Sequence, residues 1–291
     1  MVKERLTITL DRKILDEVDS TIDGINIRNR SHAIEYLLEE SLGKNMPQKA
    51  VILAGGSLVK GPNGYVPKPM LMIDNKPLIE YLIRMLVKNE IKDILILAGD
   101  KGNMLTTYFG DGSKYGVRIT YLIEEKRSGT EGALAFAKGL LNSESFFVIN
   151  GDNYYDFNVK GLCQQHAATK ALVTIALTTA ENTKSFGVTK LEGSKILNFT
   201  ENPNNETSKL VSSGFYLFSK EALDFVNSGS EPVMLEKSLF PLLASMGKLY
   251  GFVVSGNWVP LSSENIEMSI KSMEIVVSSA YSNKTKNKKS I

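Results

Sequence analysis

The first 45 residues carry two kinds of hydrophobic periodicity. Residues 5–10 alternate polar and apolar side chains, and a period of two predicts a short strand with one buried face. Apolar positions then recur at helical spacing after Asp11 and again after Asn29, and both residue types are good helix N-caps. The segment therefore predicts one strand followed by two helices.

A strand in so short a segment needs a partner, because about 45 residues bury too little apolar surface to fold alone. Pairing with the same strand of a second copy gives an antiparallel ribbon that fits the DNA major groove. This order of elements resembles the ribbon-helix-helix family of DNA-binding proteins. The resemblance implies base contacts from the outward strand residues and a phosphate contact at the start of the second helix. The residues are Arg5, Thr7, Thr9, Asn29, Arg30 and Ser31.

An alternative is a plain dimerisation arm whose Arg and Thr side chains form only a solvated face. Acidic residues outnumber basic ones in residues 1–45, which argues against a generic basic arm. The formal net charge of the whole chain is only +2, so binding to an operator in double-stranded DNA would need a local patch. Both interpretations require a homodimer. If the rest of the chain, after residue 45, also self-associates, the result would be a tetramer.

Buried strands and amphipathic helices alternate after residue 49. The predicted strands are residues 50–53, 93–98, 117–123 and 146–149, with helical patterns at 77–88, 103–109 and 130–141. Such alternation predicts an α/β fold with a mainly parallel sheet and a ligand site beyond the carboxyl ends of its strands. Short extended pieces dominate from residue 186, helical patterns return at 233–246 and 264–279, and residues 281–291 resemble a basic tail.

Polar motifs follow these strands. Gly55 and Gly56 come after the first strand and Asp152 after the fourth; small residues let backbone amides approach phosphate oxygens. The other motifs are Val66-Pro-Lys-Pro-Met-Leu71, Lys76-Pro-Leu-Ile79 and Gly129-Thr-Glu-Gly-Ala-Leu134. Together they resemble the sugar-phosphate nucleotidyltransferases, or NDP-sugar pyrophosphorylases, over about residues 49–277.

That resemblance implies a Rossmann-like α/β/α nucleotide-diphospho-sugar transferase fold over residues 49–280. It also implies a reaction in which a sugar 1-phosphate attacks the α-phosphorus of a nucleoside triphosphate and pyrophosphate leaves. The implied nucleotide contacts are Ala54, Gly55, Gly56, Lys68, Gly129 and Thr130. The implied sugar contacts are Gly187, Glu201, Ser213 and Gly214, and Asp152 is the implied ligand of a magnesium ion.

Three charges that the family normally shows are missing. Lys60 follows Leu58-Val59 where the family has Gly-Thr-Arg, Asn202 replaces a lysine, and Pro260 replaces a metal-binding aspartate. Lysine is not a bidentate clamp for a triphosphate, and Asp152 alone is a poor magnesium site. The triphosphate pocket is therefore predicted to be weakened or reshaped.

These departures favour a DNA-binding transcriptional regulator whose second domain is a pseudoenzyme that binds a nucleotide or nucleotide sugar as effector, with catalysis weak or lost. The alternative is an active sugar-1-phosphate nucleotidyltransferase with an N-terminal DNA-binding or dimerisation arm. There Lys60 stands in for the arginine and an acid such as Glu264 for the aspartate. A third possibility is a bifunctional enzyme that represses its own pathway genes.

Several other classes of protein are disfavoured. The single cysteine, Cys163, forms no intrachain disulfide, and the two histidines have no zinc-site spacing. No apolar run approaches the roughly 20 residues of a membrane span, and the charged N-terminus is unlike a signal peptide. We expect a cytoplasmic protein without a membrane partner.

Overall fold

A computed structural model describes residues 4–25, 27–41, 46–62, 64–204, 208–227, 229, 231–262 and 265–287. The chain divides into two compact units, Met1–Met46 and Pro47–Ile291. The first contains helices α1 (Arg12–Ser20) and α2 (Arg30–Ser41).

The predicted helix caps of the N-terminal unit are confirmed. The carboxylate of Asp11 accepts a hydrogen bond from a backbone N–H in the first turn of α1 at 2.8 Å, and the side-chain oxygen of Asn29 accepts one in α2 at 3.0 Å. A cap of this kind contributes about 1 kcal/mol. Polar residues at these two positions thus fix where the helices begin.

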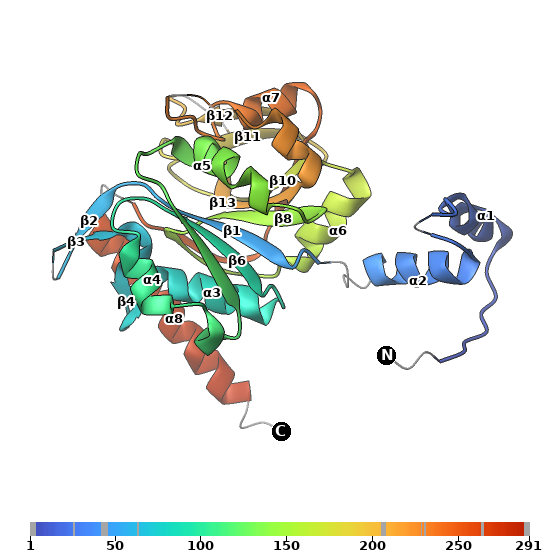
Figure 1. The fold of residues 1–291 in the computed structure, drawn as a ribbon, viewed down its shortest axis with the longest axis horizontal. Coiled ribbons are helices and arrows are strands. Elements are labelled where there is room, and N and C mark those ends of the chain that lie inside the picture. Colours follow the sequence, from blue (N-terminus) through green and yellow to red (C-terminus); the bar gives the residue numbers. More distant parts are fainter. Residues whose placement is uncertain are drawn as a thin grey trace. The chain divides into compact units, whose positions relative to one another are not determined.

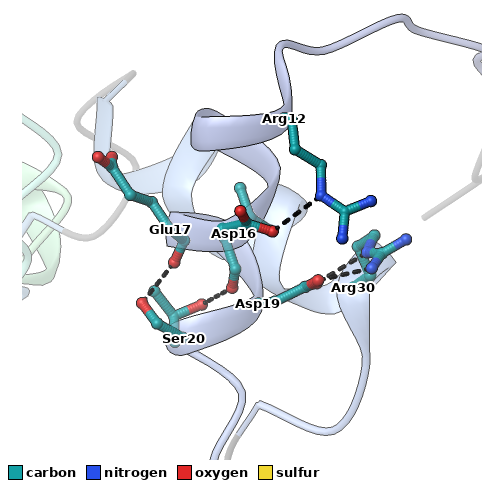
Figure 2. A network of polar contacts seen from close by, with 8 residues as sticks. Arg12, Asp16, Glu17, Asp19, Ser20 and Arg30 are labelled. Carbon is teal, nitrogen blue, oxygen red and sulfur yellow. Dashed lines mark hydrogen bonds and ion pairs between the residues drawn. The ribbon is translucent and has the colours of Figure 1, made fainter.

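An ion pair joins α1 to α2 (Figure 2). Nε and Nη2 of Arg30 donate to the two carboxylate oxygens of Asp19 at 2.7 and 2.6 Å, and these hydrogen bonds hold the pKa of Asp19 below its usual value. The guanidinium predicted to contact a DNA phosphate therefore has a partner inside its own unit. A phosphate contact by Arg30 stays a prediction, and it would require this pair to open.

The prediction of a strand at residues 5–10 is not met in the single chain. Residues 4–10 form no strand, and the side chains of Leu6 and Ile8 are 79% and 47% exposed. The described part of this unit contains no other strand whose edge could pair with them. The alternating pattern is present, but pairing would have to come from another chain.

Within the described residues, nine strands of the larger unit form one sheet in the order β10-β14-β12-β11-β13-β8-β1-β6-β7 (Figure 1). Their bounds are β1 (Lys49–Ala54), β6 (Asp93–Ala98), β7 (Arg118–Ile123), β8 (Ser145–Asn150), β10 (Val173–Thr179), β11 (Gly187–Glu192), β12 (Lys195–Glu201), β13 (Leu210–Ser219) and β14 (Leu249–Val253). Strands β8, β1, β6 and β7 are parallel, but β13, β11 and β12 pair antiparallel with their neighbours. The prediction of a mainly parallel sheet is therefore wrong for this half, although its β10 and β14 are parallel to each other.

Helices cover both faces of the sheet (Figure 1). They are α3 (Leu78–Lys88), α4 (Asn103–Phe109), α5 (Gly129–Ala137), α6 (Lys160–Thr169), α7 (Leu239–Ser245) and α8 (Ile266–Asn287), with short 3-10 turns η1 (Lys68–Met70), η2 (Ser113–Tyr115), η3 (Lys138–Leu140) and η4 (Lys220–Phe225). Three small pairs complete the unit: β2 (Leu58–Gly61) with β3 (Gly64–Pro67), β4 (Met72–Ile73) with β5 (Lys76–Pro77), and β9 (Asn153–Phe157) with β15 (Gly256–Pro260). None of the described helices combines the length and apolar character needed to cross a bilayer.

Two helical predictions need correction. The pattern at 233–246 gives a helix only from Leu239, because residues 233–235 are bonded to the start of α5 instead: the N–H of Val233 donates to the carbonyl of Ser128 at 2.8 Å. The helix predicted at 264–279 is longer, since α8 continues to Asn287, and a basic tail at 281–291 stays a prediction.

Candidate functional site

The turns after the parallel strands meet at one edge of the sheet. Gly55 and Gly56 follow β1, Glu124 follows β7, and the segment ending at Asp152 follows β8. A Cβ atom on Gly55 would lie 3.9 Å from Oε2 of Glu124. The ligand edge predicted from the sequence therefore brings the first and third turns within contact distance.

A cavity of about 790 Å³ opens beside this edge. The predicted sugar and phosphate residues that line it are Lys68, Asp152, Gly187, Glu201, Ser213 and Gly214. It is also lined by Asn150, Tyr216, Glu236 and Trp258, which sequence reasoning did not assign. Residues separated by up to about two thirds of the chain thus share one polar cavity.

Three buried polar atoms on this cavity have no hydrogen-bond partner among the described residues. They are Oδ1 of Asn150, Oε2 of Glu201 and the indole Nε1 of Trp258. Such atoms are uncommon in folded proteins, and each costs about 1–3 kcal/mol if it stays unpaired. The three atoms belong to residues that line one cavity, although each atom is itself buried; two acceptors and one donor form a set that the hydroxyl groups of a sugar can satisfy.

Two neighbouring carboxylates, the buried Glu236 and the half-buried Glu201, line the cavity. Glu236 accepts hydrogen bonds from the Tyr216 hydroxyl at 3.2 Å and the Thr130 hydroxyl at 2.9 Å, and burial raises its pKa. Burial and the charge of Glu236 raise the pKa of Glu201 to about 7. Gly187 makes room for this arrangement, because a Cβ there would lie 2.9 Å from Oε2 of Glu201.

Gly129 and Thr130, predicted at the nucleotide, have packing roles in the structure. Gly129 has a φ of +79°, and a Cβ there would come within 2.2 Å of the carbonyl oxygen of Val233. The Thr130 hydroxyl accepts from the N–H of Leu235 at 2.9 Å and donates to Glu236. These two residues therefore fasten the segment that carries Glu236 into the site, and a nucleotide contact stays a prediction.

The segment that stands where the family has Gly-Thr-Arg forms a hairpin in this structure. Leu58 to Lys60 lie on β2, which pairs with β3, and Val59 is buried in the cluster that includes Leu71 and Tyr154. Lys60 is exposed, on the opposite face of the strand. The apolar residues thus have a structural reason. A triphosphate contact by Lys60 remains a prediction.

Residues 49–261 match the nucleotidyl transferase family. The chain belongs to this family. It is 33% identical over 220 residues to mannose-1-phosphate guanyltransferase beta-A of Xenopus laevis, a match covering 73% of this chain and 61% of that protein. It is 31% identical over 218 residues to mannose-1-phosphate guanyltransferase of Yarrowia lipolytica, a match covering 72% of this chain and 60% of that protein. The chain spans about three-fifths of the length of these relatives.

Solved structures agree on the fold. A putative glucose-1-phosphate thymidylyltransferase from Bacillus anthracis, in complex with a sucrose, superimposes with a TM-score of 0.69 at 22% identity over 78% of this chain and 95% of its own. HddC from Yersinia pseudotuberculosis superimposes with a TM-score of 0.65 at 21% identity, over 77% of this chain and 99% of its own. The larger unit is therefore a mixed α/β nucleotidyltransferase-like fold.

These findings overturn the prediction of a transcriptional regulator with a catalytically disabled domain. The relatives that match most of this chain have the names of enzymes. The nucleotidyltransferase alternative is therefore favoured. The family match begins at residue 49, and these comparisons give no support to an N-terminal ribbon-helix-helix domain. Substitutions at three motifs do not outweigh the similarity of the rest of the domain.

Glu124 lies beside Gly55 at the same edge of the sheet, and sequence reasoning missed it. It follows the last residue of β7, its carboxylate accepts a hydrogen bond from the Ser128 hydroxyl, and burial raises its pKa. The available signal is a charged residue directly after a predicted strand. The same rule selected Asp152, but it was not applied to the third strand.

Magnesium is typical of this family, but the described residues do not fit a resident ion. Asp152 lies 3.4 Å from Nζ of Lys68, and β15 places Pro260 opposite Asn153, beside Asp152. No group of three or more His, Cys, Asp or Glu side chains in the described ranges could hold a metal. Glu264, the acid suggested as a substitute ligand, lies outside the described residues.

Proposed function

We propose that the chain is a sugar-1-phosphate nucleotidyltransferase whose substrates are GTP and mannose 1-phosphate. A phosphate oxygen of the sugar phosphate attacks the α-phosphorus of GTP, the bond to the β-phosphate breaks, and GDP-mannose and pyrophosphate form. The observation that carries the proposal is the cavity with its unpartnered Asn150, Glu201 and Trp258 atoms. The names of the curated relatives support the choice of guanine and mannose.

The position of Glu124 supports guanine as the base. A carboxylate offers two acceptors and no donor, and guanine presents two adjacent donors, N1–H and its 2-amino group. The neighbouring Gly55 carries no side chain, and a Cβ there would lie 3.9 Å from Oε2 of Glu124. Uracil and thymine present one N–H between two carbonyl oxygens, which an anionic carboxylate repels.

The test is pyrophosphate release from each of GTP, ATP, UTP and dTTP in the presence of mannose 1-phosphate. We expect turnover with GTP. We expect Glu124→Gln to lower kcat/KM for GTP about tenfold. Because an amide offers one donor and one acceptor, the same variant should raise kcat/KM for UTP or dTTP relative to that for GTP. Glu125→Gln, at the exposed neighbouring residue, is the control and should leave the preference unchanged. Absence of pyrophosphate with every triphosphate and sugar 1-phosphate would refute the proposal.

We infer a second role, dimerisation, for the N-terminal unit. Val18 and Ala33 are its buried apolar residues in the described part, while Ile14, Ile25 and Leu38 are 50%, 77% and 52% exposed. So small a core with so much exposed apolar surface is typical of a unit completed by another chain. Base contacts by Arg5, Thr7 and Thr9, and tetramer formation, stay predictions.

Charge on the apolar face of residues 5–10 should separate the dimer. We expect Leu6→Asp with Ile8→Asp to yield a monomer in size-exclusion chromatography with light scattering, because the paired ribbon would bury four carboxylates. Thr7→Asp with Thr9→Asp carries the same charge on the other face and should remain dimeric. A wild-type monomer at micromolar concentration would exclude this role.

A further inference from the structure

The position that would complete a metal site carries no ligand. Pro260 ends β15 directly opposite Asn153 of β9, and the next residue, Leu261, donates its N–H to the backbone carbonyl of Asp152 at 3.1 Å. The strand pair therefore holds residue 260 against Asp152, where a second carboxylate could reach the same ion. Proline offers no oxygen on its side chain, and Leu261 is buried and apolar.

A fixed cation already lies at the remaining carboxylate. Nζ of Lys68 is 3.4 Å from Oδ2 of Asp152, and the side chain of Lys68 is only 17% exposed. Pro67 and Pro69 flank this lysine and place it at the first position of η1. An ammonium group has three donors, so one can meet Asp152 while the others face the cavity that both residues line.

Both features disfavour a divalent ion. Magnesium is usually held by one or two carboxylates together with substrate phosphates, in near-ideal octahedral geometry. Here Asp152 keeps no carboxylate partner on β15, and its charge is balanced by an ammonium group that would repel a second cation at short range. The ammonium is also in a position to meet a phosphate group directly.

We propose that the Lys68 ammonium takes the place of a protein-held divalent ion, so that this site binds the phosphates of its ligand without a resident metal. The identity of the ligand rests on the proposed function, but the absence of a metal site does not. Any magnesium in turnover would then arrive bound to the triphosphate, whose β- and γ-phosphates chelate it in solution.

The first experiment uses Mn²⁺ alone and no nucleotide. Electron paramagnetic resonance of free Mn²⁺ should show no loss of signal on adding the wild-type protein beyond that given by Asp152→Asn. We expect Lys68→Met with Pro260→Asp to create a site and reduce the free signal, and adding Asp152→Asn to abolish it. Lys68→Met with Pro260→Ala tests loss of the proline and lysine without a new carboxylate. Stoichiometric Mn²⁺ binding by the wild type that depends on Asp152 would overturn the proposal.

The second experiment measures GDP-mannose binding by calorimetry, with magnesium or with EDTA. The wild-type Kd should agree within about twofold in the two buffers, and Lys68→Met should weaken binding about tenfold or more in both. Lys76→Met, a lysine over the Tyr81 ring outside the cavity lining, is the control. Wild-type binding that disappears in EDTA would overturn the inference. If GDP-mannose does not bind at all, the proposed substrates fail while the Mn²⁺ experiment still decides the question of the metal.

Discussion

Phe215→Ala is expected to lower the free energy of unfolding by about 3–5 kcal/mol, the range for removing a buried aromatic ring. Phe215 is fully buried on β13, opposite Ile149 of β8. Its ring centroid lies 5.4, 5.5 and 5.2 Å from those of Phe147, Tyr155 and Phe157. Deleting the ring leaves a cavity between three other aromatic side chains, which close packing prevents from collapsing fully.

The effect should reach the site. The Tyr155 hydroxyl lies 3.0 Å from the carbonyl oxygen of Asn150 and 3.1 Å from that of Gly214 and can donate its one proton to either, so the ring that packs on Phe215 also connects β8 to β13 at the cavity. We expect weaker GDP-mannose binding together with the loss of stability.

Urea unfolding followed by fluorescence measures this prediction, since Trp258 is the single tryptophan of the chain and lies in the larger unit. Phe136→Ala is the matched control: this ring on α5 is 63% exposed, and its removal should change stability by about 0.5 kcal/mol or less. Equal effects at the two positions would show that the aromatic cluster around Phe215 does not stabilise the sheet.

The parallel half of the sheet and its ligand edge could be predicted from the sequence. Four apolar runs, each followed by small or polar residues, were enough to place Gly55, Gly56 and Asp152 at one edge. The antiparallel half was harder, because hydrophobic periodicity indicates which face of a strand is buried but not which strands pair. The predicted strand at 5–10 illustrates the same limit, since its partner is not in the described chain.

Glu236 shows why part of the site could not be predicted. It lies in a run with helical spacing, and the contact that positions it comes from Thr130, 106 residues away. A long-range hydrogen bond between two common residue types leaves no local pattern. The substituted motifs were misleading for a different reason. Val59 departs from the family's phosphate turn, but the structure buries it in a hairpin. The substitution alone is therefore not evidence of lost catalysis.

Glu201→Gln is expected to weaken binding of mannose 1-phosphate and GDP-mannose about 10- to 100-fold. Glu201 lines the cavity, its buried Oε2 has no hydrogen-bond partner among the described residues, and hydrogen bonds to a charged group contribute about 1.5–3 kcal/mol. Glu192→Gln, at the exposed end of β11, makes the same chemical change outside the cavity and should bind like the wild type. Titration calorimetry of both variants measures the difference.

The pH dependence separates ligand binding from stability. Burial and the neighbouring Glu236 raise the pKa of Glu201 to about 7 from an ordinary value of 4.5, so the folded protein holds this proton more tightly than the unfolded chain. The wild type should therefore lose stability relative to Glu201→Gln as pH rises from about 4.5 through about 7, with the difference constant above that.

Sugar binding should follow the opposite trend in the wild type. The carboxylate is the stronger acceptor for a sugar hydroxyl, so affinity should rise as pH passes through about 7 and should stay flat through this window in Glu201→Gln. Melting temperatures and GDP-mannose affinities at about pH 5 and about pH 8.5 test both trends. Wild-type and variant curves that run parallel in both measurements would mean that Glu201 does not change its charge in this range, and the carboxylate would lose its proposed role in sugar recognition.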